Sequence, residues 1–192
     1  MFFKQLQPCQ LGFKNISMQK SIVNLSIFLV FALAFVNSCQ STRSTSVSNN
    51  SSKVSAETTL RQGIIKDAEK HKGVKYKYAG KDPKGFDCSG FTYYVCSKHR
   101  IKLSSSSTSQ SKQGVEVPIS KVKPGDLLFF GRNGRNGKIQ HVGIVYKNTS
   151  DGLYMIHSSS KRGIVIDNVT SSKYWKPKLL FAKTILGLKG KS

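Results

Sequence analysis

Three residues of this sequence have the types and the order that nucleophilic catalysis requires. Cys88 follows Asp87 where the pattern predicts the start of a helix. The N–H groups of a helix N-terminus favour an anion, so we expect a thiolate there with a lowered pKa. His141 opens the apolar segment HVGIVY, and His157 follows the apolar residues 153–156. The pattern therefore predicts Cys88 as nucleophile, His141 as the base that takes its proton, and His157 as the group that orients the base.

A structural interpretation of the same residues stays open. A lone cysteine is most often a buried apolar filler, and a single histidine on a sheet is most often structural. Two histidines on consecutive strands, downstream of a cysteine at a helix start, favour catalysis, because adjacent antiparallel strands can bring both rings to one face.

Metal and cofactor binding are not predicted. Cysteine and histidine are zinc ligands, but these three lack the short ligand pairs of most zinc sites. The glycine-rich stretch at residues 131–137 lies between predicted strands rather than before a helix, so it does not fit a phosphate-binding loop.

The elements that must position these residues come as helices first and strands second. Apolar residues on one face predict a helix at 58–72, ended by Gly73, and a second helix begins near Cys88. The polar segment after it has room for a short third helix. Five apolar segments then predict strands, at 127–131, 139–146, 152–160, 162–169 and 179–186. This order predicts an α+β domain with helices packed on a small antiparallel sheet.

Cys88 and Cys96 are not expected to form a disulfide. If both lie on one helix, their separation along the sequence corresponds to about 12 Å of rise. A disulfide needs Cα atoms within about 7 Å. Each therefore stays a free thiol, either a buried filler or a reactive group.

The N-terminal part of the chain has the pattern of an export signal. The apolar run at 22–36 is shorter than the about 20 residues of a spanning helix, and a short basic start at Met18 precedes it. A small residue followed by Cys39 resembles the cleavage box of a bacterial lipoprotein, in which this cysteine becomes the lipidated N-terminus. A plain secretory signal or an N-terminal membrane anchor is the alternative.

We divide the chain accordingly into a signal peptide at 1–39, a flexible polar tether at 40–56 and a catalytic domain at 57–192. The tether has too few apolar groups to build a core. A lipid on Cys39 would then hold the domain at a membrane of the bacterial cell envelope while the tether lets it reach a neighbouring polymer.

The charge of the chain implies an anionic partner. The sequence has 31 Lys and Arg against 9 Asp and Glu, a formal charge of +22. Nucleic acid, anionic lipid and anionic cell-wall polymers would all be attracted. The export signal argues against nucleic acid.

Several of these residues, in their order along the chain, resemble those of a known family. The motif Phe-Asp-Cys-Ser-Gly-Phe at 86–91 resembles the nucleophile motif of the NlpC family of cell-wall cysteine peptidases. The likeness continues in order: Tyr76 and Gly80 precede the motif, the Pro-Gly-Asp-Leu turn at 124–127 and the base strand at 141–144 follow it, and His157 stands at the third position. It covers residues 60–185. Ala79 stands where a glycine is usual, and the basic loop at 132–138 is not expected from the family.

The resemblance implies a papain-like fold and a peptidase that needs no cofactor. Its implied reaction is hydrolysis of the bond between D-glutamate and a diamino acid in peptidoglycan stem peptides, through a thioester on Cys88. The Cys88 backbone N–H and the Tyr76 hydroxyl would stabilise the oxyanion. Asp87 and Ser89 would contact the free amine of the substrate, or alternatively cap the helix.

Two other functions remain as alternatives. The chain could be a non-catalytic basic lipoprotein that holds wall polymers, or an amidase or acyltransferase with the same three catalytic residues. In each case we expect a monomer.

Overall fold

Helices precede the strands along the chain, and together they form the predicted α+β fold. The computed structural model describes residues 46–132 and 138–188, which lie in one unit that begins at Ser44. The expected signal peptide, Met18 and Cys39 lie outside the described residues. The helices and strands are α1 (Ser46–Glu69), β1 (Lys81–Asp82), β2 (Gly85–Phe86), α2 (Cys88–Lys98), α3 (Ser107–Gln110), β3 (Val115–Val117), β4 (Leu127–Gly131), β5 (Ile139–Thr149), β6 (Gly152–Ser159), β7 (Gly163–Asn168) and β8 (Leu179–Thr184).

The main sheet is antiparallel and has six strands in the order β3-β8-β4-β5-β6-β7. Five of its strands are the five apolar segments identified in the sequence. The sequence did not indicate β3, which is short and mostly exposed at the sheet edge, or the small hairpin of β1 and β2.

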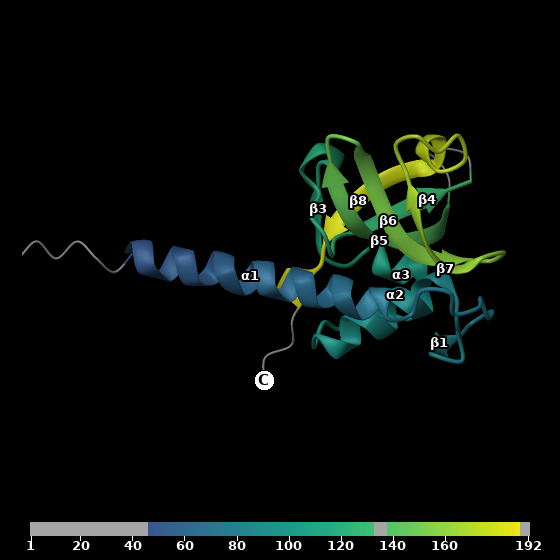
Figure 1. The fold of residues 1–192 in the computed structure, drawn as a ribbon, viewed down its shortest axis with the longest axis horizontal. Coiled ribbons are helices and arrows are strands. Elements are labelled where there is room, and N and C mark those ends of the chain that lie inside the picture. The colour runs from purple at the N-terminus through teal and green to yellow at the C-terminus, as the bar shows by residue number, and fades with distance from the viewer. Residues whose placement is uncertain (1–45, 133–137, 189–192) are drawn as a thin grey trace, which may run out of the picture. The chain divides into compact units, whose positions relative to one another are not determined.

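Apolar side chains alternate between the two faces of the sheet. Figure 1 shows α2 and α3 on one face, where the larger cluster of buried residues includes Phe91 of α2 and Phe129 and Ile144 of the sheet. On the other face Phe130 and Met155 form a second cluster, and Trp175 packs against it. The sheet is therefore buried on both sides at its centre.

The first helix begins further upstream than the sequence predicts. Residues 46–56, assigned to a flexible tether, are helical in α1, and the first part of this helix projects beyond the rest of the domain (Figure 1). No glycine or proline occurs from residue 46 to residue 62, so nothing in the backbone stops a helix that Leu60 and Ile64 anchor on the core.

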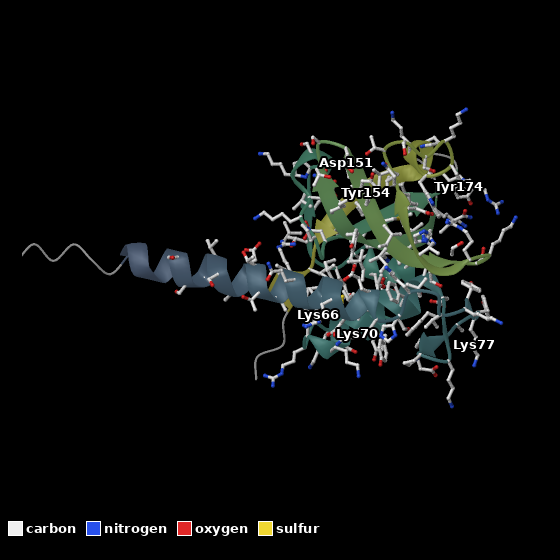
Figure 2. All side chains as sticks on the ribbon, in the orientation of Figure 1. Lys66, Lys70, Lys77, Asp151, Tyr154 and Tyr174 are labelled. Carbon is white, nitrogen blue, oxygen red and sulfur yellow. The ribbon has the colours of Figure 1, made fainter. Side chains whose placement is uncertain are left out.

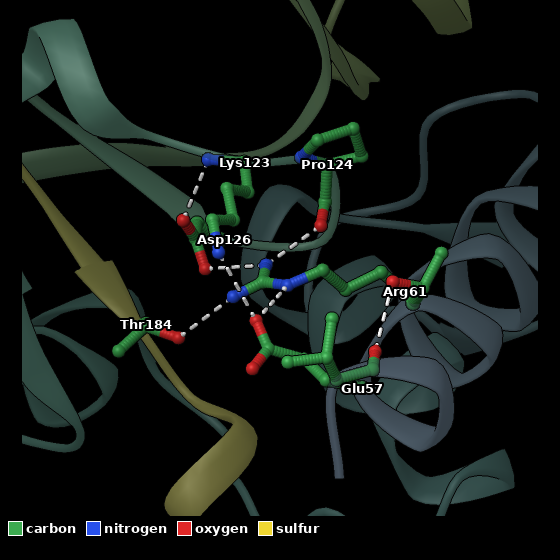
Figure 3. Close-up of polar contacts among 8 residues, drawn as sticks. Glu57, Arg61, Lys123, Pro124, Asp126 and Thr184 are labelled. Carbon is green, nitrogen blue, oxygen red and sulfur yellow. Dashed lines mark hydrogen bonds and ion pairs between the residues drawn. The ribbon is translucent and has the colours of Figure 1, made fainter. Parts of the chain in front are cut away.

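A buried ion pair joins α1 to the turn before β4. Arg61 and Asp126 are both buried, and the Arg61 guanidinium donates to the Asp126 carboxylate and to the Pro124 carbonyl, each at 2.8 Å (Figure 3). Asp126 also accepts from the backbone N–H of Lys123 at 2.8 Å, and Arg61 pairs with Glu57 on its own helix at 2.9 Å. The turn that starts β4 is thus held by a helix more than sixty residues earlier in the chain.

We predict that Asp126→Asn lowers the free energy of unfolding by about 3 kcal/mol, because the buried Arg61 cation would lose its buried counter-ion and keep only the more exposed Glu57. Urea unfolding followed by circular dichroism measures the change. Lys70→Gln is the control, because it removes one member of the exposed pair between Asp67 of the same helix and Lys70, which directly follows the helix, and exposed pairs contribute little. Equal small losses in the two variants would contradict the role given to the buried pair.

Candidate active site

Cys88 is the first residue of α2, and Asp87 caps this helix. The Asp87 carboxylate accepts from the backbone N–H of Gly90 at 2.6 Å and from the Ser89 hydroxyl at 3.1 Å. Cys88 and Cys96 are both free thiols, as predicted. The structure therefore shows for Asp87 the capping role that the sequence left as an alternative.

A close approach of two backbone segments places the nucleophile. The Asp87 N–H donates to the Gly80 carbonyl at 3.0 Å, and a Cβ atom at Gly90 would lie 1.9 Å from that carbonyl oxygen. Only glycine fits at Gly90, because no side chain tolerates such a contact with backbone. The loop that carries Tyr76 also joins this region through a parallel bridge between Tyr76 and Phe86.

The two histidines come together through the register of the sheet. Strands β5 and β6 pair with Ile144 opposite Ile156. The same antiparallel register puts Gly143 opposite His157. A Cβ atom at Gly143 would lie 3.2 Å from the His157 Cβ atom. His141 lies two residues from Gly143 and so points to the same face. The His141 ring can therefore reach diagonally across the position that Gly143 leaves clear.

The next strand, β7, adds a carboxylate beside the two histidines in the same diagonal arrangement. Strands β6 and β7 pair with His157 opposite Val165, so Asp167, two residues further, faces the same side of the sheet. The His141 Nε2 and His157 Nδ1 atoms are 3.0 Å apart, and His157 Nε2 lies 3.0 Å from Asp167 Oδ2. Three adjacent strands thus contribute one hydrogen-bonded row.

The carboxylate sets the direction of these hydrogen bonds. Hydrogen bonds from His157, Arg162 and Trp175 hold the pKa of Asp167 well below its ordinary value, so this group is ionised and can only accept. His157 Nε2 therefore carries the hydrogen, and a neutral His157 accepts at Nδ1 from the Nε2–H of His141. This tautomer leaves Nδ1 as the basic nitrogen of His141.

Arg162 and Trp175 hold Asp167 from the other sides. The Arg162 guanidinium lies 2.6 Å and the Trp175 indole nitrogen 2.9 Å from Asp167 Oδ2. The Trp175 ring also stacks on His141, with centroids 4.8 Å apart and planes at 27°. One tryptophan therefore covers the base and binds the carboxylate at the end of the row.

The thiol differs from our expectation, because burial raises the pKa of Cys88. Backbone N–H groups of Val142, Ser89 and Cys88 itself act in the opposite direction but do not outweigh the loss of solvent. Burial, helped by the neighbouring His157, lowers the pKa of His141 to about 3. At neutral pH the resting pair is thus a thiol and a neutral imidazole, so His141 must take the proton as the sulfur attacks.

Cys88 and His141 open into the same cavity, whose volume is about 800 Å³. Tyr76 lies in its wall, and burial and the nearby Cys88 raise the pKa of its phenol. Neither Asp87 nor Ser89 is among the described residues that line this cavity. Ser89 is buried and bonds to the Ser105 carbonyl at 3.1 Å.

Sequence reasoning missed Asp167 and Trp175. Asp167 did carry a signal, because aspartate is disfavoured inside a strand and this one interrupts the apolar segment at 162–169. Trp175 carried none, since it lies in an irregular stretch between β7 and β8 whose path the sequence does not reveal. The basic loop at 132–138 cannot be placed in the site, because residues 133–137 lie outside the described part of the chain.

A cysteine at a helix start beside a histidine row on an antiparallel sheet is the arrangement of a cysteine-peptidase-like domain. Residues 73–184 match the model of the NlpC/P60 family, and the chain belongs to this family.

Relatives and solved structures agree with this assignment. The chain is 38% identical to a gamma-DL-glutamyl hydrolase of Bacillus subtilis over 66% of this chain and 30% of that protein, and 33% identical to a gamma-D-glutamyl-L-lysine dipeptidyl-peptidase of Bacillus subtilis over 64% and 40%. Its fold resembles an NlpC/P60 family protein from Bacillus cereus (TM-score 0.60, 31% identity, 66% of this chain and 40% of that one) and the NlpC/p60 domain of the peptidoglycan hydrolase SagA (TM-score 0.54, 31% identity, 65% and 97%). The chain thus spans less than half the length of these two curated relatives.

We predict that Asp167→Asn slows alkylation of Cys88 by iodoacetamide at neutral pH and lowers kcat/KM at least about tenfold. The negative charge of Asp167 raises the pKa of His141, so its loss makes the imidazole a weaker base. At high pH, where hydroxide removes the thiol proton directly, the two proteins should react at similar rates.

The control is Asp151→Asn, the same chemical change in the turn between β5 and β6. Asp151 is bound by Lys147 and Tyr154 and lies apart from Tyr174 of the cavity wall (Figure 2). It should leave the pH dependence of alkylation unchanged. A deficit of Asp167→Asn that stayed constant at every pH would point to general damage of the structure instead.

Proposed function

We propose that this chain is a cysteine peptidase that hydrolyses the bond between D-glutamate and the following diamino acid in peptidoglycan stem peptides. The observation that carries the proposal is the hydrogen-bonded row from Asp167 through His157 to His141, which ends at the cavity that Cys88 shares. The names of two relatives, a gamma-DL-glutamyl hydrolase and a gamma-D-glutamyl-L-lysine dipeptidyl-peptidase, support a γ-glutamyl bond as the target.

The reaction begins when Nδ1 of His141 takes the Cys88 proton as the sulfur attacks the γ-carbonyl carbon. The oxygen of that carbonyl becomes an anion, which the Cys88 N–H and the Tyr76 hydroxyl stabilise; one such donor is worth about 3 kcal/mol of barrier. The imidazolium then gives its proton to the leaving amine, the C–N bond breaks, and a thioester remains on Cys88.

Hydrolysis of the thioester repeats these steps with water. Neutral His141 takes a proton from the water, whose oxygen attacks the thioester carbon, and returns it to the departing sulfur. In both halves the His157 Nδ1 atom accepts from His141, and Asp167 stabilises the positive charge that the base acquires. The charged state of the histidine exists only during the reaction, so this stabilisation favours the transition state over the resting enzyme.

We predict that Cys88→Ala abolishes release of stem-peptide fragments from purified peptidoglycan, measured by mass spectrometry. Cys96→Ala is the matched control, because Cys96 is fully buried and burial raises the pKa of its thiol to about 12. That variant should remain active and lose about 1 kcal/mol or more of stability through the small cavity it leaves. Fragments released by folded Cys88→Ala protein would show that the nucleophile has been assigned wrongly.

We also propose that Cys39 carries a lipid that holds the enzyme at a membrane of the cell envelope. The apolar run at 22–36 followed by a small residue and cysteine supports this. Within residues 46–132 and 138–188, no helix has the length and hydropathy required to cross a membrane.

For the lipid anchor, we expect Cys39→Ala to move the protein from the detergent-soluble membrane fraction to the soluble fraction, because the lipid attached through the Cys39 sulfur would be lost. Immunoblots of fractionated cells and mass spectrometry of the mature N-terminus measure this. Unchanged membrane association with an N-terminus elsewhere would rule the lipid out.

A further inference from the structure

The cavity that holds Cys88 contains more positive than negative side chains. Lys161, Arg162 and Lys178 line it, and Asp167 is the one carboxylate among its described lining residues. Arg162 pairs with Asp167 at 2.6 Å, and His157 and Trp175 occupy the same carboxylate oxygen. Because Arg162 and Asp167 neutralise each other and His141 is neutral at pH 7, the two lysines give the cavity a net positive charge.

The backbone that carries Lys161 is fixed next to the nucleophile. The turn between β6 and β7 follows Ser159, and the hydroxyl of the preceding residue, Ser158, donates to the Phe86 carbonyl at 2.7 Å. Where the turn ends, the Ile164 N–H donates to the Val74 carbonyl at 2.9 Å. Both ends of the turn are therefore tied to the segment that precedes Cys88, which holds the backbone of Lys161 at the rim of the cavity.

Lys178 enters the cavity from the other direction. It ends a short 3-10 helix at Lys176–Lys178, directly after Trp175, and Trp175 stacks on His141. The Lys178 ammonium lies 3.2 Å from the centre of the Tyr174 ring, a contact that holds a cation in place and leaves its N–H groups able to donate. Tyr174 is itself part of the cavity wall.

We propose that Lys161 and Lys178 form a subsite for the free α-carboxylate of the γ-glutamyl residue, and that the enzyme selects this acid over its α-amide. The inference rests on the proposed function. When glutamate is linked through its γ-carbonyl, its α-carboxyl group stays free and lies only a few bonds from the bond that is cut. A substrate placed over Cys88 must therefore bring this group into the cavity, where the paired state of Asp167 removes the repulsion that a free carboxylate would cause.

The α-amide form fits the same space but lacks the charge. An amide would leave the two ammonium groups without a counter-ion beside the substrate, and charge interactions near a protein surface are stronger than in bulk water. Hydrogen bonds to a charged group contribute enough binding energy for a difference of about tenfold or more. The preference should appear mainly in KM, because the carboxylate interacts with the lysines both before and during the reaction.

The test uses three synthetic peptides: L-Ala-γ-D-Glu-L-Lys, the same peptide with the glutamyl α-carboxyl as an amide, and the same peptide with only the C-terminal carboxyl as an amide. We expect kcat/KM of the wild-type enzyme to fall about tenfold or more for the first amide and little for the second. The double variant Lys161→Gln/Lys178→Gln should cleave the acid and its α-amide at similar rates.

The control is Lys66→Gln/Lys70→Gln, which removes the same charge at the C-terminal end of α1; Lys66 and Lys70 (Figure 2) are not among the described cavity residues. It should keep the preference of the wild type. Equal cleavage of acid and α-amide by the wild type, or a loss that follows the C-terminal amide instead, would overturn the subsite.

A binding measurement separates this proposal from the proposed function. Isothermal calorimetry with Cys88→Ala protein should show tighter binding of the acid than of the α-amide, and the added Lys161→Gln/Lys178→Gln changes should remove the difference. If the wild type cleaves none of the peptides but Cys88→Ala still binds the acid selectively, the subsite stands and the proposed reaction fails. If the peptides are cleaved without any difference in binding or rate between acid and α-amide, the proposed reaction stands and the subsite fails.

Discussion

The hydrogen bond from His157 to Asp167 is the interaction on which the rest of the site depends. A carboxylate can only accept, so it decides which nitrogen of His157 carries hydrogen, and His157 in turn decides this for His141. Without that fixed end, each ring could adopt either tautomer, and the base would present its lone pair in the productive direction only part of the time. Arg162 and Trp175 hold the carboxylate in place, so the direction of the whole row is set at the end that lies two strands away from His141.

The sheet makes this row possible through its register. His141, His157 and Asp167 come from three successive strands, and each step is diagonal, as the pairings of Ile144 with Ile156 and of His157 with Val165 require. A shift of one residue in either pairing would send one member to the opposite face, among the apolar side chains beneath the helices. Gly143 leaves the space that the two histidines need, because a side chain there would collide with Met155 and His157. Catalytic geometry is here a consequence of strand pairing.

Much of the fold and part of the site could be predicted from the sequence. Periodic apolar residues indicated the main helices and the five long strands, and the types and order of Cys88, His141 and His157 identified residues that line or adjoin one cavity. Local patterns indicate elements and not their register, so they could not show that Asp167 follows His157 in the row. The expected pKa of Cys88 was wrong because a helix N-terminus is visible in a sequence, whereas burial of the thiol depends on how distant segments pack over it. The upstream part of α1 is not predictable from composition, because a polar segment without apolar periodicity has the same pattern whether it is helical or flexible.

The raised pKa of Cys88 also bears on how the enzyme survives between substrates. Peroxides and other oxidants attack thiolates far faster than thiols, and oxidation beyond the sulfenic state cannot ordinarily be reversed. A sulfur that stays protonated until a carbonyl carbon lies before it spends little time in the vulnerable form. The burial that makes this nucleophile harder to activate therefore also protects its sulfur from oxidation.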